Sequence, residues 1–271
     1  MKKTRPRLDQ FFTNDNIVDF CLSKVNISSY DVVIEPSAGS GSFYFKIEHK
    51  NKIAIDLEPQ FSETIHKDFL QYGQFSRFSN ENILVIGNPP FGKNSSLAVK
   101  FFNHASSFAN TIAFVLPRTF RKPSIQNRLN EYFHLYFEEI LPKNSFHTPD
   151  KKICNVPCVW QIWNKKNKIR KKFVRKNKHK DFEFVERKDA DFLIQRVGGG
   201  AGHITKDMNH KERAFYNIKG SDKVYNIFKK IDWEKSSKYD TAGNPSLSKG
   251  DIVEMYDNEI LLTSDCKKGG T

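Results

Sequence analysis

The segment with the most specific chemistry is the tetrapeptide Asn88-Pro89-Pro90-Phe91, which directly follows the apolar run 83–86. Two consecutive prolines remove two backbone donors and stiffen the turn, so the carbonyl groups there stay free to accept hydrogen bonds. Asn88 adds an amide oxygen, and Phe91 adds a flat apolar ring. Because acceptors hold N–H groups while a ring stacks on a heterocycle, the pattern favours a site for an exocyclic amine over a purely structural turn.

Acidic residues stand at the ends of further apolar runs, where strands of a parallel sheet would end. Glu35 follows Val-Val-Ile, Asp56 follows Ile-Ala-Ile, and Asp68 stands at the next such position with Phe69 beside it. Ligands of open parallel sheets bind at the carboxyl ends of the strands, where an acid such as Asp56 commonly binds ribose hydroxyls. Asp68 offers an acceptor for an adenine amino group. Each acid alone is more often a helix cap or turn residue, but the three together favour a nucleoside pocket.

Glu35 is followed by a glycine-containing loop at 36–43, Pro-Ser-Ala-Gly-Ser-Gly-Ser-Phe. Glycine is needed where the backbone takes a positive φ or approaches a ligand closely. Gly39 and Gly41 therefore predict a tight turn against a ligand. The acid before them suits an ammonium group or hydroxyls, because it would repel a pyrophosphate.

The elements that would position these residues extend from residue 9 to about residue 163. Thr13 and Asn14 are suitable N-cap residues for an amphipathic helix, whose apolar positions are 17, 18, 21, 22 and 25. Short apolar runs are typical of strands buried between helices, and they occur at 32–34, 53–55, 83–86 and 112–116. The stretches 134–141 and 156–163 predict an antiparallel pair that closes the sheet. The fold class is therefore α/β.

The net charge of the chain favours a polyanionic partner. It has 44 Lys and Arg against 31 Asp and Glu, a formal charge of +13 and a pI near 9.4, which favours nucleic acid over an acidic membrane surface. Ten of the cations fall in segment 164–180, which contains no acid, so it is either a solvated tether or a nucleic-acid-binding arm. The candidate contacts are Lys165, Lys166, Lys168, Arg170, Lys171, Lys172, Arg175 and Lys176.

A length of 271 residues exceeds the usual size of one hydrophobic core. We predict a first domain at 1–163, a basic linker at 164–180 and a small C-terminal domain at 181–271. Within the last, 191–197 predicts a strand and 223–231 a helix. The glycine-rich stretch 198–202 lacks the Lys-Ser or Lys-Thr of a phosphate loop and is interpreted as a flexible or tight turn. Asn244-Pro245-Ser246 lacks a second proline and is interpreted as a plain turn.

Cysteine content and hydropathy exclude several classes of protein. Four cysteines are too few for a disulfide framework, and only Cys154 and Cys158 lie close together, so we expect reduced packing thiols and no metal site. The basic N-terminus lacks the apolar stretch of a signal peptide. No apolar run approaches the roughly 18 residues of a membrane span. We therefore expect a soluble, cytoplasmic protein.

Taken together, these motifs resemble the S-adenosylmethionine-dependent N6-adenine DNA methyltransferases of the gamma motif order, in which the cofactor motifs precede the catalytic motif and target recognition lies C-terminal. The resemblance covers about residues 9–163. It implies a Rossmann-like, mostly parallel seven-stranded sheet whose last strand is antiparallel, followed by a smaller target-recognition domain. It also implies direct methyl transfer from S-adenosylmethionine to the N6 amino group of a flipped adenine in DNA, without a metal.

The resemblance also implies roles for individual residues. Asn88, Pro89, Pro90 and Phe91 match the catalytic tetrapeptide: the Asn88 side chain and the Pro89 carbonyl would accept the protons of the amine, and Phe91 would stack on the base. Thr13 ends the motif Asp9-Gln10-Phe11-Phe12-Thr13, which would cover the methionine end of the cofactor, and Asn14 follows where the family usually has proline. The implied cofactor contacts are Phe12, Thr13, Glu35, Pro36, Ser37, Ala38, Gly39, Gly41, Asp56, Leu57, Asp68 and Phe69.

Other hypotheses stay open at this stage. The same tetrapeptide serves adenine in RNA and the amide of a protein glutamine, and Phe91 in place of tyrosine only tilts the choice toward adenine. The charge of +13 disfavours a small or acidic protein substrate but does not separate DNA from RNA. A non-catalytic nucleic-acid-binding protein with the same fold is a further hypothesis, against which the intact tetrapeptide argues.

Overall fold

The computed structural model describes residues 11–265 apart from 74, 76, 77, 79, 149 and 242. The chain divides into two compact units, Met1–Lys172 and Phe173–Thr271. Asp9 and Gln10 of the expected N-terminal motif lie outside the described residues, as does Cys266.

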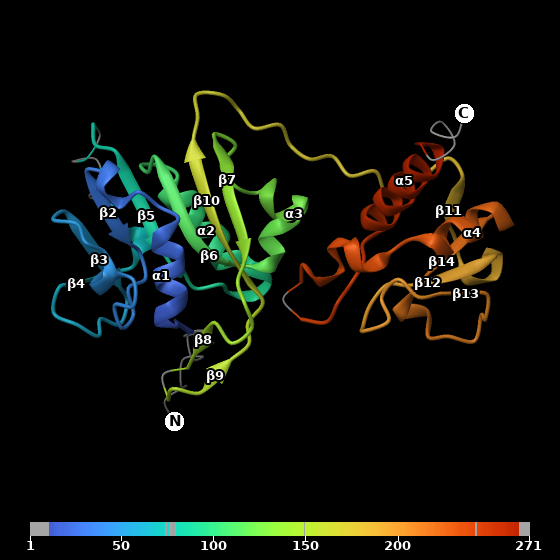
Figure 1. Ribbon diagram of the computed structural model, residues 1–271, viewed down its shortest axis with the longest axis horizontal. Coiled ribbons are helices and arrows are strands. Elements are labelled where there is room, and N and C mark those ends of the chain that lie inside the picture. Colours follow the sequence, from blue (N-terminus) through green and yellow to red (C-terminus); the bar gives the residue numbers. More distant parts are fainter. Residues whose placement is uncertain are drawn as a thin grey trace. The chain divides into compact units, whose positions relative to one another are not determined.

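The first unit is built on a seven-stranded sheet with the order β4-β3-β2-β5-β6-β10-β7 (Figure 1). Neighbouring strands from β4 to β6 are parallel, whereas β10 is antiparallel to both β6 and β7. The predicted Rossmann-like sheet with an antiparallel last strand is therefore confirmed. The strands are β2 (Val32–Glu35), β3 (Lys52–Asp56), β4 (Thr64–His66), β5 (Ile83–Gly87), β6 (Thr111–Pro117), β7 (Phe133–Ile140) and β10 (Cys158–Lys165).

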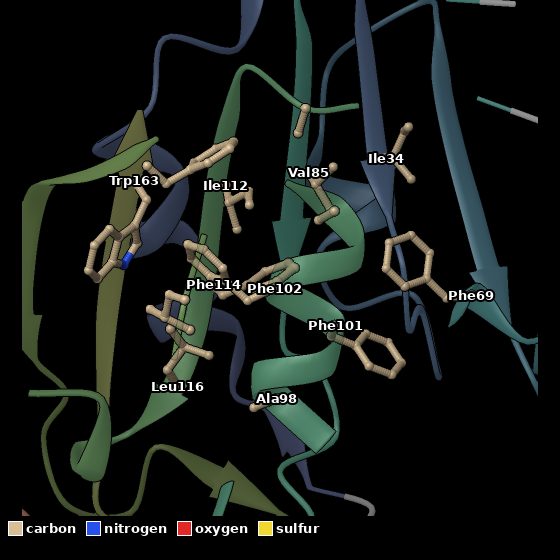
Figure 2. Close-up of a cluster of buried hydrophobic side chains, with 14 of the residues drawn as sticks. Ile34, Phe69, Val85, Ala98, Phe101, Phe102, Ile112, Phe114, Leu116 and Trp163 are labelled. Carbon is tan, nitrogen blue, oxygen red and sulfur yellow. The ribbon is translucent and has the colours of Figure 1, made fainter. Parts of the chain in front are cut away.

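Helices cover both faces of this sheet. On one face α1 (Asp15–Ser23) packs its apolar positions, Ile17 among them, against side chains of β2 and β5. On the other face α2 (Ser96–Ala105) packs against the alternate residues of the same strands. Figure 2 shows Phe102 of this helix beside Ile112 and Phe114. Because these strands are covered on both faces, β5 and β6 are buried along their whole length and are apolar apart from Thr111.

The expected alternation of strands and helices is incomplete after β2 and β3. Residues 36–51 form only the short 3₁₀ helix η2 (Tyr44–Lys46), and 57–63 is shorter than the dozen or so residues that a helical crossover needs. In this region the rings of Tyr44 and Phe45 lie 5.1 and 4.8 Å from the ring of Phe61. The unit also contains α3 (Pro123–Gln126) and the 3₁₀ helices η1 (Ile27–Ser29), η3 (Phe69–Gln71), η5 (Lys93–Ser95) and η6 (Arg118–Arg121).

A second, small sheet of the first unit brings the N-terminal motif to the loop between β7 and β10. It consists of β1 (Phe12–Thr13), β8 (Phe146–His147) and β9 (Ile153–Cys154), all antiparallel. Sequence periodicity did not reveal these strands, because two residues are too few to show alternation. The pairing sets Thr13 opposite Phe146 and holds β1 in place.

The second unit has a four-stranded sheet with the order β11-β14-β12-β13. Its strands are β11 (Phe182–Phe184), β12 (Phe192–Gln195), β13 (Ile204–Thr205) and β14 (Phe215–Gly220). One face packs against α4 (Asp222–Lys230) and α5 (Lys249–Asp265) around a common apolar core. The short 3₁₀ helices are η7 (Arg187–Asp189), η8 (Glu212–Ala214), η9 (Trp233–Lys235) and η10 (Ser237–Tyr239). In the described parts of both units, no helix combines the length and the hydropathy needed to cross a membrane.

Sequence expectations for this unit were met at β12 and α4, but α5 was missed. The glycine-rich stretch 198–202 is a tight turn between β12 and β13. Gly202 has a φ of +101° there, and a Cβ at this position would stand 2.4 Å from the Trp233 ring. Asn244 lies in a turn where its carbonyl accepts a hydrogen bond from Thr241 at 3.1 Å. Both segments therefore have structural roles within this unit.

Arg170, from the basic segment, is anchored to the first unit. Its Nη2 donates to the carbonyl oxygens of Gln126 and Leu129 at 2.8 and 3.3 Å, and its Nε donates to that of Phe133 at 3.1 Å. The guanidinium also lies 5.6 Å from the centre of the Trp163 ring. These contacts connect the end of the unit to the loop before the edge strand β7.

Replacing Arg170 by Met keeps the apolar stem but removes the three hydrogen bonds of the guanidinium, although the Gln126 carbonyl oxygen still accepts from the Leu129 N–H. We expect the free energy of unfolding of the first unit to fall by about 2–3 kcal/mol, measured by urea denaturation. The matched control is Lys171→Met, a change at an exposed cation next in sequence, which should alter stability by less than about 0.5 kcal/mol. Equal effects of the two substitutions would contradict the anchoring role.

Candidate active site

A cavity of about 210 Å³ opens at the carboxyl edge of the large sheet. It brings together all four residues of the tetrapeptide and eleven of the twelve expected cofactor contacts, while Gly41 lies outside its wall. The expected residues in the wall are Phe12, Thr13, Glu35, Pro36, Ser37, Ala38, Gly39, Asp56, Leu57, Asp68, Phe69, Asn88, Pro89, Pro90 and Phe91.

The cavity wall includes further residues that the site prediction did not contain. Two of them, Leu97 and Phe101, are four residues apart on α2 and so share a helix face. That spacing was visible in the sequence, but nothing in it showed which strand end the helix would approach. The others are Phe11, Ser42, Phe43, Gln60, Lys67 and Leu70.

The side-chain amide of Asn88 is hydrogen-bonded at its nitrogen but not, among the described residues, at its oxygen. Its Nδ2 donates to the Phe11 carbonyl oxygen at 2.9 Å and to Oγ1 of Thr13 at 3.2 Å. Because a carbonyl can only accept, these bonds fix which end of the amide faces β1. Oδ1 is buried and has no hydrogen-bond partner among the described residues. Since an unpaired buried acceptor costs about 1–3 kcal/mol, this geometry suits a ligand that brings a donor.

Glu35 is the second unpaired acceptor in the cavity wall. It is 3% exposed, and Oε2 has no hydrogen-bond partner within the described part of the chain. Burial raises the pKa of this carboxyl well above its usual range, and nearby Asp56 adds to the rise, while a backbone hydrogen bond at Tyr44 and the charge of Lys52 oppose it. A cationic donor in the cavity would therefore restore the charged form of Glu35.

Gly87 makes room for Glu35 directly before the tetrapeptide 88–91. Gly87 has a φ of +144°, and a Cβ there would stand 3.2 Å from Cγ of Glu35. The residue that follows is Asn88, so close packing between β2 and β5 brings the two unpaired acceptors into one cavity.

Asp56 and the glycine loop are connected by a hydrogen bond. The Gly39 N–H donates to Asp56 Oδ2 at 2.7 Å, and the Glu58 N–H donates to Oδ1 at 2.8 Å. Each carboxylate oxygen keeps a second lone pair for a ligand hydroxyl. The expected positive φ is confirmed at Gly39 and Gly41, at +50° and +83°. Gly41 acts behind the wall, where a Cβ would stand 2.5 Å from the Phe45 ring.

Asp68 lies in the cavity wall and also caps η3. Its Oδ1 accepts a hydrogen bond from the Leu70 N–H at 2.9 Å. Phe69 beside it is 1% exposed and packs with its ring centre 5.2 Å from that of Phe101. Figure 2 shows the two rings near each other, with Phe101 extending from α2. Asp68 therefore keeps its helix-capping role while its other oxygen stays available at the wall.

Hydrogen bonds hold the tetrapeptide 88–91 at both ends. Ser37 Oγ donates to the Asn88 carbonyl oxygen at 3.0 Å. The Phe91 carbonyl accepts hydrogen bonds from the Leu97 and Ala98 N–H groups at 3.1 and 3.2 Å, which connects the loop to the start of α2. These contacts fix the backbone on either side of the two prolines.

Of the eight expected nucleic-acid contacts, some already pair with other side chains or with carbonyl groups of the protein. Besides Arg170, Arg175 pairs with Asp251 and, at 3.3 Å, with Glu254. Lys176 is 3.9 Å from Asp257. Exposed lysines make up the remainder of the set: Lys165, Lys166, Lys168, Lys171 and Lys172.

The described cysteines carry free thiols. Cys21 and Cys158 are buried free thiols, and Cys154 is a half-buried one. No group of three or more His, Cys, Asp or Glu side chains suited to a metal ion occurs among the residues that the structure describes.

No protein-family model and no curated protein matches this chain. Among solved structures, a modification subunit of a putative type I restriction enzyme from Vibrio vulnificus YJ016 is similar, with a TM-score of 0.43 and 14% identity over 58% of this chain and 44% of that one. A putative RNA methyltransferase from Pyrococcus horikoshii has a TM-score of 0.45 and 16% identity over 61% and 92% of the two chains. The 23S rRNA methyltransferase ErmE has a TM-score of 0.42 and 14% identity over 59% of this chain and 71% of that one. This chain thus spans less than half the length of the first of these proteins.

Replacing Glu35 by Gln should reveal the buried carboxyl in the free protein. A raised folded-state pKa means that stability is greatest below the unfolded pKa of about 4.3 and falls as the pH rises through the folded value. We therefore expect Glu35→Gln to be more stable than the wild type at about pH 8, with the difference shrinking toward about pH 5. Thermal unfolding across this range, with the exposed Glu48→Gln as control, measures the effect. A difference independent of pH would contradict the raised pKa.

Proposed function

We propose that this chain is an S-adenosylmethionine-dependent methyltransferase that acts on the N6 amino group of adenine in DNA. The observation that supports it most is a pair of buried acceptor atoms in one cavity wall, Glu35 Oε2 and Asn88 Oδ1, which have no hydrogen-bond partner among the residues that the structure describes. One acceptor carries a potential negative charge and the other is neutral. Such a cavity suits two ligands with different donors, a cation and an amine.

The cavity residues fit S-adenosylmethionine at several of its groups. Glu35 would face a cationic group, and Asp56 would accept from the ribose hydroxyls. Asp68 would accept from the adenine amino group of the cofactor, beside Phe69. The Thr13 hydroxyl accepts from Asn88, so its own proton is available for the cofactor carboxylate. The bound cofactor would supply the methyl group.

The acceptor nitrogen would be activated by the catalytic loop. The amino nitrogen of adenine is a poor nucleophile because its lone pair is delocalised into the ring. Asn88 Oδ1 and the Pro89 carbonyl would accept its two N–H groups and localise that lone pair, while Phe91 would stack on the ring. Catalysis would then depend on positioning and on fixed dipoles. An adenine in a duplex would first have to be flipped out.

The charge of the chain supports a nucleic acid as the second substrate. The acidic side chains Glu35, Asp56 and Asp68 lie in the cavity wall, while ten of the cations lie in segment 164–180. All eight lysines of this segment are exposed, so a phosphate backbone can approach them from solvent. The second unit would contribute to target selection. These features serve DNA and RNA alike, so the choice of DNA rests on the resemblance of the motifs.

Labelled methyl transfer followed by nucleoside analysis tests the proposed reaction. We expect label from S-adenosylmethionine to appear as N6-methyladenine in unmethylated DNA. Parallel reactions contain RNA and a glutamine-containing protein extract. Label in RNA adenine without label in DNA would overturn the DNA assignment, label in glutamine amide would overturn the adenine assignment, and label in none of them would overturn the methyltransferase itself.

Asn88→Ala removes the unpaired acceptor from the same reaction. We expect the transfer rate to fall by about a hundredfold or more, because the amine would lose one of its two acceptors. Cofactor binding measured by calorimetry should persist. A variant with an unchanged rate would show that Asn88 has no catalytic role.

Substituting five of the exposed lysines, Lys165, Lys166, Lys168, Lys171 and Lys172, by Gln should weaken DNA binding for all sequences. The slope of log affinity against log salt should become shallower by about 0.9 for each phosphate that the lysines no longer neutralise. Arg170 and Arg175 stay unchanged, because their partners belong to the two folded units. Fluorescence anisotropy at several salt concentrations measures the slope. An unaltered slope would show that the segment is only a tether.

A further inference from the structure

Asn14 stands at the N-cap of α1, yet its side chain makes no capping hydrogen bond within the described chain. It turns instead to the loop between β7 and β10. Its Nδ2 donates to the Asn144 carbonyl oxygen at 2.8 Å, and its Oδ1 lies 2.8 Å from Nδ1 of His147. Its backbone N–H donates to the Ser145 carbonyl oxygen at 3.0 Å. The residue therefore exchanges a local cap for three bonds to a segment about 130 residues away.

The direction of each of these bonds is fixed by chemistry. The Asn144 carbonyl can only accept, so it must face the Nδ2 end of the Asn14 amide. Oδ1 then faces His147, and the ring nitrogen Nδ1 must be the donor. The contact therefore requires a proton on Nδ1 of His147.

The loop at 142–147, to which Asn14 bonds, is fixed by its own contacts. Asn144 has a φ of +63°, a left-handed conformation that asparagine tolerates better than most residues. Ser145 is 1% exposed, and its Oγ donates to the Pro142 carbonyl oxygen at 2.6 Å. Phe146 is fully buried in the core beneath α1. Such a loop can hold the position of β1.

The same strand β1 orients Asn88. Thr13 is 2% exposed and pairs with Phe146, and Phe12 pairs with His147, their rings 5.7 Å apart. The two acceptors that saturate Asn88 Nδ2 are Phe11 O and Thr13 Oγ1, from the residues three and one positions before Asn14. A shift of β1 would therefore release the Asn88 amide and with it the direction of Oδ1.

We propose that Asn14, with Asn144, Ser145 and His147, forms a latch that positions the catalytic amide of Asn88. We call these four residues the Asn14 latch. The inference rests on the proposed methyltransferase function for its effect on rate, but the orientation of Asn88 can be observed without any reaction. Asn14 acts through β1 and is a positioning residue, since it is not part of the cavity wall.

A graded series at Asn14 tests the latch. Asn14→Pro fits the local backbone, where φ is −65° and the preceding Thr13 is extended, and it removes all three bonds. Asn14→Ala removes the two side-chain bonds, and Asn14→Asp keeps the backbone bond and the acceptor for His147. At saturating cofactor we expect kcat to fall by about ten- to a hundredfold for the proline variant, less for alanine and least for aspartate.

The readout that does not depend on activity is the Asn88 side-chain amide. Its two Nδ2 protons, assigned by comparison with Asn88→Ala, should be protected from solvent exchange in the wild type and lose that protection in Asn14→Pro. Ser23→Ala is the matched control: it removes a 2.7 Å hydrogen bond to Phe20 at the far end of α1, and should change neither quantity.

The outcomes separate the latch from the proposed function. Unchanged kcat and unchanged Asn88 protection in Asn14→Pro would overturn the latch, as would a fall in thermal stability with both quantities intact. Lost protection in a protein whose wild type transfers no methyl group would uphold the latch and overturn the methyltransferase proposal.

Discussion

The parallel run of strands β4, β3, β2, β5 and β6 is the constraint on which the candidate site depends. It sends the carboxyl ends of these strands to one edge, so Glu35, Asp56 and Asn88 meet although 53 residues separate the first from the last. Cores on both faces, built largely around α1 and α2, hold that edge in place. The same packing keeps Oδ1 of Asn88 and Oε2 of Glu35 buried, without a hydrogen-bond partner in the described part of the chain. Burial of the strand ends thus creates both the shape and the unsatisfied chemistry of the cavity.

Two unpaired buried acceptors lower the stability of the free protein, and the surrounding hydrogen bonds show why the arrangement persists. Asn88 cannot rotate to pair Oδ1 without giving up its bonds to Phe11 and Thr13. Glu35 can lower the cost of burial by keeping its proton, which is the meaning of its raised pKa. The cavity is therefore preorganised for donors, and ligand binding would recover the missing hydrogen bonds.

The positive charge has two physical roles in this chain. Arg170 and Arg175 use their guanidinium groups inside the two folded units, one on carbonyl oxygens and the other on carboxylates. Exposed lysines of the same segment remain for a polyanion. A charge run in a sequence does not distinguish these roles, because only the folded chain supplies or withholds the partners. Arginine suits the structural role, since its planar fork can serve several oxygens at once.

The sequence by itself determined the large sheet, the tetrapeptide and most of the cavity wall, because apolar runs ending in Glu35, Asp56 and Asn88 encode buried strands and their ends locally. Only the tertiary structure decided what holds these groups in place. The strands β1, β8 and β9 are too short to show a period, and α5 has too weak an apolar pattern. The side chain of Asn14 matched a helix cap in the sequence but bonds to Asn144 and His147 in the fold. Contacts between segments about 130 residues apart form only when the whole chain has folded, so a local sequence pattern cannot predict them.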